Sequence, residues 1–219
     1  MQDEQSLRAG LARCYGGILH DVMRARGLTD FTLPPTLTPL EDCSTPLFGP
    51  AFTMLGRPQP GAGEHATLLA WTGFLSRAPS GHVVVIQPND NEVAHMGELS
   101  AETLKLKGVA GVVVDGGARD VSFIRSIGLP VWSRYRTPRD VVNYWLPEAF
   151  DVPVQIGAVR IVPGDWIFAD ADGVLCLPQA HAQAVVARSL ELIETENLVR
   201  RDILQGIDPQ EAYLRHRKF

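Results

Sequence analysis

Short apolar runs alternate with amphipathic stretches through the middle of the chain. The runs at 81–90, 109–117 and 129–135 are bounded by Pro, Gly or polar residues, which predicts three buried strands. The stretches between them, 100–108 and 121–128, have the spacing of helices. This order indicates α/β units with at least partly parallel strands. Ligand-binding loops are then expected beyond the carboxyl ends of the strands.

Both ends of the chain have helical patterns. Apolar residues at helical spacing predict two short helices over 6–26, with an interruption near Gly16 and Gly17. Residues 179–206 predict one long helix, with Gly206 as its stop.

The remaining segments are rich in proline, glycine and turn residues. Residues 31–66 suit loops and short strands, and 46–56 is the best strand candidate among them. Residues 137–150 are expected to be irregular. Turn signals divide 152–178 into a β-meander or a barrel-like cap. The sequence Asp-Ala-Asp-Gly at 170–173 fits a β-turn, because the glutamate that a calcium loop requires at its twelfth position is missing.

The composition limits the class of protein. The 219 residues include 20 Lys+Arg against 25 Asp+Glu and no basic run, which argues against nucleic-acid binding and a lysine-rich membrane surface. The cysteines, Cys14, Cys43 and Cys176, lie far apart, which argues against disulfides and a thiolate zinc site. The polar start and the lack of a long apolar run argue against a signal peptide and a membrane span. We expect one domain over 1–219 in the cytoplasm, with neither nucleic acid nor membrane as a partner.

Several common catalytic motifs are absent from the sequence. It has no GxGxxG, no GxxxxGK[ST], no HExxH and no GxSxG, so dinucleotide, P-loop, zinc-protease and serine-hydrolase sites lose their usual signals. The three lysines, Lys105, Lys107 and Lys218, fall on an exposed helical stretch or beside the terminus, which argues against a buried Schiff-base lysine. Carbonyl chemistry would then need a metal ion.

Arg119 and Asp120 stand side by side at the end of the second predicted strand. On one interpretation Asp120 is the N-cap of the next helix and Arg119 is a solvated neighbour. Ser100 would be the N-cap of the preceding helix, which Gly108 ends.

The second interpretation is a binding site that includes the loop at 95–102. If the first two strands are parallel neighbours, both loops lie at one edge of the sheet, and Glu98 converges with Arg119 and Asp120. The start of the helix adds free N–H groups, those of Leu99, Ser100 and Ala101. Helix-start amides bind carboxylates, a guanidinium binds an oxyanion, and a carboxylate holds a hydrated hard cation. Together they predict a site that binds a 2-oxo acid and stabilises its enolate.

Residues 97–120, GELSAETLKLKGVAGVVVDGGARD, resemble the signature of a known family. This family joins regulator of ribonuclease activity A to the 4-hydroxy-4-methyl-2-oxoglutarate/4-carboxy-4-hydroxy-2-oxoadipate aldolases. In the aldolases an acidic residue precedes Arg-Asp by a gap of twenty residues, and Glu98, Arg119 and Asp120 stand at that spacing. The similarity extends from residues 19–27 to the tail helix.

The resemblance implies a fold and an assembly. The fold is an α/β, αββα sandwich with a central β-barrel-like sheet of the swivelling β/α/β type and a long C-terminal helix. The chain would assemble as a homotrimer or a hexamer with sites between subunits.

The resemblance also implies roles for individual residues. Asp120 would bind Mg²⁺ or Mn²⁺, Arg119 would contact the keto oxygen and steady the pyruvate enolate, and Glu98 would hold a metal-bound water. The pyruvate carboxylate would be bound by the backbone amides of Gly97, Glu98, Leu99 and Ser100.

The aldolases also use a glutamate from the C-terminal helix of a neighbouring subunit. The candidates on this chain are Glu191, Glu194 and Glu196. We select Glu196 as the second metal ligand; the other interpretation of all three is a solvated helix face.

The chain departs from the aldolase pattern in places. Glu98 replaces Asp and reaches further by one methylene, and Phe123 stands where the aldolases tend to carry Asp or Glu. The second departure bears on the aldol substrate more than on metal binding. Arg134, Arg136 and Arg139 would recognise a distal carboxylate or, alternatively, form surface or interface salt bridges.

Two functions follow from these features. The first is a metal-dependent lyase on small 2-oxo acids, which releases pyruvate by retro-aldol cleavage or decarboxylates an oxaloacetate-like acid. The second is a non-catalytic, protein-binding regulator on the same fold. Asp120 favours the enzyme, because the regulators of this family lack the metal-binding aspartate.

Overall fold

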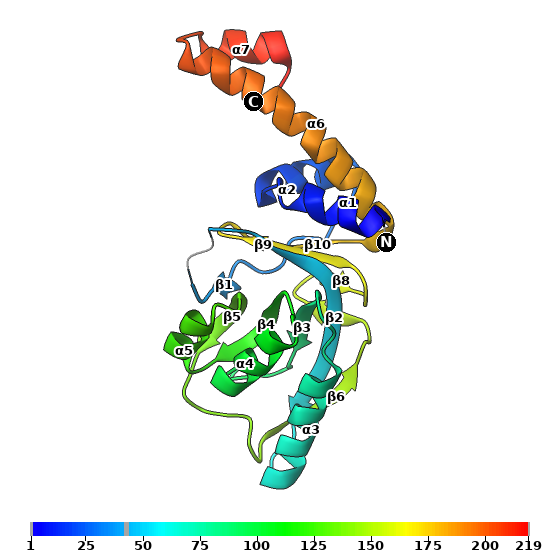
Figure 1. Cartoon of the computed structure of the whole chain (residues 1–219), viewed down its shortest axis with the longest axis vertical. Helices are drawn as coiled ribbons and strands as arrows, with labels where there is room; N and C mark the ends of the chain where they lie inside the picture. The colour runs from blue at the N-terminus through cyan, green and yellow to red at the C-terminus, as the bar shows by residue number, and fades with distance from the viewer. Residues whose placement is uncertain (1, 42–43, 219) are drawn as a thin grey trace. The chain divides into compact units, whose positions relative to one another are not determined.

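The computed structural model describes residues 2–41 and 44–218 and divides into two compact units (Figure 1). The sheet unit comprises Asp30–Gln179, and the helical unit combines Met1–Thr29 with Ala180–Phe219. The single domain expected over the whole chain stays a prediction.

Four parallel strands form the centre of the sheet unit, in the order β5-β4-β3-β2. The strands and the helices that connect them are β2 (Leu47–Pro58), α3 (Glu64–Arg77), β3 (Val83–Gln87), α4 (Glu98–Leu106), β4 (Gly111–Ala118), α5 (Val121–Ile127) and β5 (Val131–Arg136). The predicted parallel α/β units are confirmed, as is the strand predicted at 46–56.

Helix α3 was not predicted from the sequence. Its apolar residues include the consecutive run from Leu68 to Trp71, which obscures the three- and four-residue spacing of the buried positions. In the structure Thr67, Trp71, Phe74 and Leu75 are buried, whereas Leu68 and Leu69 are exposed. The face of this helix that packs against the sheet therefore becomes clear only from the structure.

Antiparallel strands pair with β2 on the side opposite β3. Its first residues pair with β9 and its last with β6, so that this long strand joins two parts of one sheet. The additional strands are β1 (Thr38–Pro39), β6 (Trp145–Phe150), β7 (Val154–Ile156), β8 (Val159–Ile161), β9 (Trp166–Asp170) and β10 (Gly173–Leu177). The predicted meander is present as the hairpins β7-β8 and β9-β10. The irregular segment expected at 137–150 instead contains β6.

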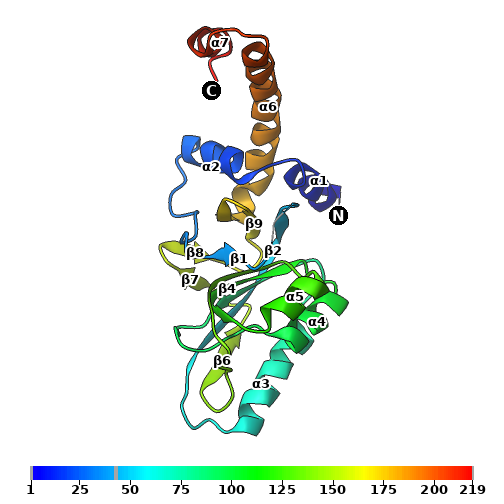
Figure 2. The ribbon, with the colours of Figure 1, turned by 90° about the vertical axis from the view of Figure 1, so that its left-hand side faces the viewer.

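The central strands are buried on both faces. Val84 and Ile86 of β3 pack in a core with α3, α4 and α5, whereas Val83 and Val85 pack in a second core with β7 to β10. Alternate residues of a strand point to opposite faces, so one short strand supplies both cores. Figure 2 shows the three helices on one side of the sheet and the β7-β8 hairpin on the other. The mixed α/β fold with a barrel-like sheet, predicted from the sequence, is confirmed.

The helical unit is built from α1 (Gln2–Leu11), α2 (Gly16–Ala25), α6 (Gln179–Leu204) and α7 (Pro209–His216). Gly16 and Gly17 begin α2 rather than interrupt a helix, since the break falls on the four residues before them. Helix α6 is the long C-terminal helix predicted, and Gly206 follows it at φ +85°. None of the described helices is long and apolar enough to cross a membrane.

Each unit contains a buried thiol, and the helical unit also contains a buried carboxylate. Cys14 and Cys176 are free and buried, and Cys43 lies outside the described residues. In the helical unit, Asp202 on α6 accepts hydrogen bonds from Arg215 at 2.9 Å and from His216 Nε2 at 2.8 Å. These contacts fasten α7 to α6.

Candidate active site

The loops that follow β3 and β4 run side by side at the carboxyl edge of the sheet. The backbone N–H of His95 donates to the Gly117 carbonyl at 2.8 Å, and the N–H of Arg119 donates to the Met96 carbonyl at 2.9 Å. These bonds continue the parallel pairing of β3 and β4 beyond the strands. As expected for adjacent parallel strands, they bring the start of α4 to the Arg119-Asp120 pair.

Asp120 has a left-handed backbone at φ 55° and occupies the N-cap position of α5. Its side chain makes no capping bond to α5; instead Oδ2 accepts a hydrogen bond from the backbone N–H of Glu98 at 3.2 Å. Asp120 therefore stands at the predicted N-cap position, but its side chain does not cap α5. A left-handed non-glycine residue is uncommon, and such outliers occur at functional sites.

Arg119 lies between two carboxylates. Its Nε is 3.4 Å from Asp120 Oδ2, and its NH1 is 3.2 Å from Asp140 Oδ2. Asp140 belongs to the segment between β5 and β6 and was missed in the sequence, where that segment was treated as irregular. The only available signal was its place next to Arg139 in a stretch of charged residues.

Gly97 allows the two loops to approach each other closely. A Cβ atom at this position would lie 2.9 Å from Asp120 Oδ2 and 3.3 Å from Arg119 Cγ. A contact of 2.9 Å is shorter than a Cβ normally tolerates, so any larger residue displaces the pair. Glycine is therefore favoured here by space and not by backbone conformation, because its φ of −145° is open to all residues.

Helix α4 begins at Glu98, with Gly97 at its N-cap. The prediction of Ser100 as the N-cap is wrong, because Ser100 lies inside the helix and its Oγ accepts a hydrogen bond from Trp71 Nε1 at 2.8 Å. The predicted stop at Gly108 fits its φ of +74°.

The first turn of α4 retains two amides without an acceptor among the described residues, those of Leu99 and Ser100. The N–H of Ala101, which was expected to be free, donates to the Gly97 carbonyl at 3.0 Å. Free N–H groups at a helix start attract anions.

A cleft of about 380 Å³ opens at this edge of the sheet. It brings together the sequence-predicted residues Gly97, Glu98, Leu99, Ser100, Arg119 and Asp120. Asp140 lines the same cleft.

Glu196 lies in the helical unit, on α6. The Tyr15 hydroxyl donates to it, and Lys218 Nζ lies 3.1 Å from its carboxylate. The other two candidates form surface ion pairs, Glu194 with Arg13 and Glu191 with Arg188.

The donor set of the cleft limits the kind of metal that it could hold. Within the described residues no cluster of three or more His, Cys, Asp or Glu side chains is arranged around a metal position. Asp120 is 37% exposed, and its Oδ1 accepts no hydrogen bond from the part of the chain that the structure describes. Mg²⁺ is commonly held by one or two carboxylates and keeps several waters. The residues fit a hydrated hard cation and do not fit an all-protein cage.

The three arginines after β5 have different surroundings. Arg134 NH1 lies 3.3 Å from Asp115. Burial raises the pKa of the Asp115 carboxyl above its usual value, and the nearby arginine only partly offsets this rise. Arg139 pairs with Glu92 outside the cleft. Arg136 lines a second hollow, which also includes Arg119 and Asp120.

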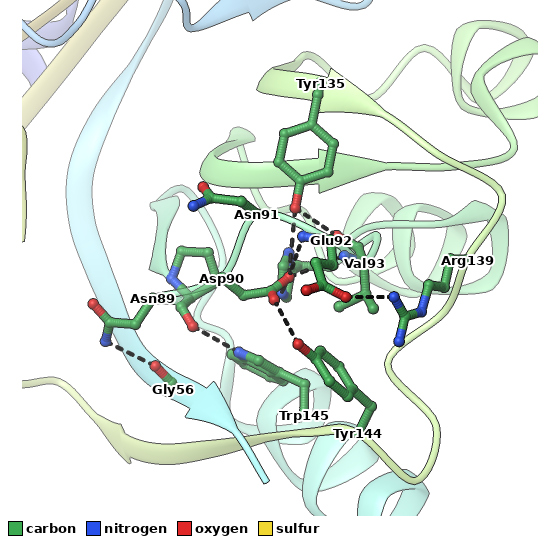
Figure 3. A network of polar contacts seen from close by, with 12 residues as sticks. Gly56, Asn89, Asp90, Asn91, Glu92, Val93, Tyr135, Arg139, Tyr144 and Trp145 are labelled. Atoms are coloured by element: carbon green, nitrogen blue, oxygen red, sulfur yellow. Dashed lines mark hydrogen bonds and ion pairs between the residues drawn. The ribbon is translucent and has the colours of Figure 1, made fainter. Parts of the chain in front are cut away.

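A buried polar network around Asp90 fixes the loop that leads into α4 (Figure 3). Its Oδ2 accepts from the N–H groups of Glu92 and Val93, both at 2.9 Å, and its Oδ1 accepts from the Tyr144 hydroxyl at 3.3 Å. Tyr135 adds a hydroxyl at 3.5 Å. Burial raises the pKa of Asp90, but the backbone bonds from Val93 and Glu92 together with His95 and the Tyr144 hydroxyl outweigh burial, and the pKa lies below its usual value. Sequence reasoning missed this network, whose only signal is the polar Pro-Asn-Asp-Asn-Glu stretch after β3.

The fold and the cleft define an α/β protein with helix-start amides, an arginine and carboxylates gathered at the carboxyl edge of a parallel sheet. The chain belongs to the RraA-like family, described as Aldolase/RraA, whose model matches residues 17–176. The resemblance seen in the sequence is thereby confirmed.

Relatives in this family carry different names. A protein of Halalkalibacterium halodurans, provisionally named as a 4-hydroxy-4-methyl-2-oxoglutarate aldolase, is 28% identical over 86% of this chain and 85% of its own length. Protein DlpA of Legionella pneumophila is 29% identical over 92% of this chain, which spans only 32% of DlpA. The crystal structure of Streptomyces coelicolor RraAS2, described as an unusual member of the RNase ES inhibitor RraA family, matches with a TM-score of 0.79 and 29% identity over 89% of this chain and 96% of that one. The family therefore includes proteins named as lyases and proteins named as inhibitors.

Proposed function

We propose that this protein is a divalent-metal-dependent lyase on small 2-oxo acids. It would release pyruvate by retro-aldol cleavage or decarboxylate an oxaloacetate-like acid, and both reactions pass through the pyruvate enolate. The observation that carries the proposal is Asp120, whose carboxylate faces Glu98 and Arg119 in a cleft instead of capping its own helix.

The start of α4 binds the carboxylate of the 2-oxo acid in this proposal. The N–H groups of Leu99 and Ser100 have no described acceptor, and the helix dipole adds a partial positive charge at the same point. Neighbouring Arg119 then meets the keto oxygen and stabilises the charge that develops there.

The residues at the cleft fit Mg²⁺ or Mn²⁺, with Asp120 as the ligand on this chain. The cation would supply Lewis-acid polarisation of the keto group. Glu98 orients a water and moves the proton to or from C3 of the enolate. We further propose a homotrimer or hexamer in which Glu196 of a neighbouring subunit completes the ligand set.

The bond changes of the aldol reaction balance without a co-reactant. The C3–C4 bond breaks, the C4 hydroxyl loses its proton as C4 becomes a carbonyl, and C3 gains a proton to give pyruvate. In the decarboxylation, the same enolate forms as carbon dioxide leaves.

The alternative function is a protein-binding regulator without catalysis. The likeness to RraAS2, described as belonging to an RNase inhibitor family, favours it. Fold alone does not separate the two functions, since unrelated functions share folds.

Pyruvate release tests the proposal. The substrates are 4-hydroxy-4-methyl-2-oxoglutarate, oxaloacetate and 4-hydroxy-2-oxohexanoate, each with Mg²⁺, with Mn²⁺ and with a chelator. Metal-dependent turnover that Asp120→Asn lowers by about a thousandfold, and that Asp172→Asn on an exposed turn leaves unchanged, supports the lyase. No turnover of any of these acids together with no bound metal would favour the regulator.

A further inference from the structure

The residues that line the cleft include a polar group and an apolar group, which we call its polar end and its apolar end. The polar end consists of Gly97, Glu98, Arg119, Asp120 and Asp140. The apolar end is formed by α3 and by the segment before β6, and consists of Leu68, Trp71, Leu75, Val141 and Val142. The two ends are continuous, so one small ligand would touch both.

The polar atoms near the apolar end already have partners. Trp71 Nε1 donates to Ser100 Oγ at 2.8 Å, Thr72 Oγ1 donates to the Leu68 carbonyl at 2.8 Å, and Thr103 Oγ1 donates to the Leu99 carbonyl at 2.7 Å. Each hydroxyl bonds the backbone of its own helix, and the indole N–H is buried. This end of the cleft therefore presents carbon atoms rather than hydrogen-bond donors.

The apolar wall of the cleft is packed against other aromatic side chains of this chain. The Trp71 ring lies 5.2 Å from the Phe74 ring and 6.0 Å, edge-on, from the Trp145 ring. Leu68 is 43% exposed, so it has apolar surface left to cover. Covering such surface is favourable, and a fixed wall loses little entropy when it binds.

The charges around the cleft point to the same specificity. Among the described lining residues Arg119 is the only Lys or Arg, and it is held at the polar end by Asp120 and Asp140. Arg134 and Arg139 are paired outside the cleft. A second carboxylate at the apolar end would lose its water without gaining a cation from this chain, which is costly.

We infer that the substrate carries an uncharged, apolar substituent at C4. This inference rests on the proposed function. The carboxylate and keto group bind at the polar end, and the C4 substituent packs against Leu68, Trp71 and Val141. The cleavage products are then pyruvate and an apolar aldehyde or ketone, with the bond changes given above.

Two ligands of the same shape separate this specificity from catalysis. The first is 5-methyl-2-oxohexanoate and the second is 2-oxoglutarate. Two methyl groups of the first ligand stand where the second has its distal carboxylate oxygens. Neither ligand has a C4 hydroxyl, so neither can undergo retro-aldol cleavage. By calorimetry with Mg²⁺ the branched monocarboxylate should bind about tenfold more tightly, which is typical of added carbon in an apolar pocket. Leu68→Arg should reverse the preference. Leu69→Arg is the matched control, because Leu69 is 63% exposed on the same helix and lies outside the cleft lining.

The outcomes distinguish the inference from the function on which it rests. Equal or tighter binding of 2-oxoglutarate, or a shift with Leu68→Arg no larger than with Leu69→Arg, overturns the inference even if the lyase is active. Tighter binding of the branched acid, reversed by Leu68→Arg, upholds the specificity even if no acid is cleaved. In a working lyase, 4-hydroxy-2-oxohexanoate should show a higher kcat/KM than 4-hydroxy-4-methyl-2-oxoglutarate.

Discussion

Asp140 Oδ2 lies 3.2 Å from Arg119 NH1, while Asp120 Oδ2 lies 3.4 Å from Nε of the same guanidinium. The Arg119 and Asp140 side chains are about two-fifths exposed, at 38% and 43%. An ion pair that is this solvated contributes little to stability, roughly 0–1 kcal/mol. We expect its value to lie in geometry, since two ion-pair contacts restrict the orientation of the guanidinium in the cleft.

Asp140→Ala should therefore lower kcat/KM for pyruvate release by about ten- to a hundredfold, because misplaced catalytic groups carry penalties of this size. Asp140→Asn, which keeps an oxygen toward Arg119, should retain more activity. Urea unfolding should change little in either variant. Glu148→Ala is the control: it removes another exposed ion pair of the sheet unit, with Arg57, and should leave turnover unchanged. Full activity in Asp140→Ala would show that Arg119 needs no second carboxylate.

Gly97→Ala tests the close approach of the two loops. The new Cβ would lie 2.9 Å from Asp120 Oδ2, so the carboxylate must move and its bond from the Glu98 N–H must lengthen. We expect Mg²⁺ affinity and turnover to fall together by at least about tenfold. Gly73→Ala is the matched control, because a Cβ there meets nothing within 4 Å. It should keep activity and add roughly 0.5–1 kcal/mol to stability. Unchanged metal affinity in Gly97→Ala would contradict the assigned role of Asp120.

The convergence of Glu98, Arg119 and Asp120 could be predicted from sequence because it depends on local rules. Each residue follows a short apolar strand, and adjacent parallel strands end at the same edge of the sheet. The rules did not predict where the Asp120 side chain points: it accepts a hydrogen bond from the start of α4 and not from its own helix α5.

Asp140 and α3 could not be predicted in this way. The backbone around Asp140 is placed by long-range contacts, in which the Arg139 carbonyl accepts from the Ala94 N–H at 2.8 Å and the Tyr144 hydroxyl reaches Asp90. Neither contact leaves a periodic signal in the sequence. The apolar end of the cleft was missed for the same reason, because it depends on which face of α3 the sheet buries.

Ser100→Ala should destabilise the sheet unit without touching the catalytic charges. The buried Trp71 Nε1 would lose its acceptor at 2.8 Å, and an unpaired buried donor costs about 1–3 kcal/mol. Urea unfolding should show this loss. Ser126→Ala removes an exposed hydroxyl that bonds only its own helix, and it should change stability by less than about 0.5 kcal/mol. Equal stability of the two variants would show that the indole finds another partner.

His95 should make the stability of the protein depend on pH. Its side chain is fully buried against the Trp145 ring, and Nε2 lies 3.5 Å from Asp90 Oδ2 without forming a hydrogen bond. Gly116 faces Nδ1, where a Cβ atom would lie only 2.5 Å away. Burial lowers the pKa of His95 from 6.5 to about 4, and the nearby Asp90 only partly opposes this change.

His95 therefore becomes protonated at a lower pH in the folded protein than in the unfolded chain. Stability from neutral His95 is complete above pH 6.5 and is lost between pH 6.5 and about 4, by roughly 2–3 kcal/mol. Asp90 has a lowered pKa, so its own contribution is lost only at more acidic pH. Urea unfolding between pH 4.5 and 7 should show the slope in the natural protein and a flatter profile in His95→Gln. His65→Gln, on an exposed position of α3, should keep the slope. An unchanged slope in His95→Gln would assign the acid sensitivity to other groups.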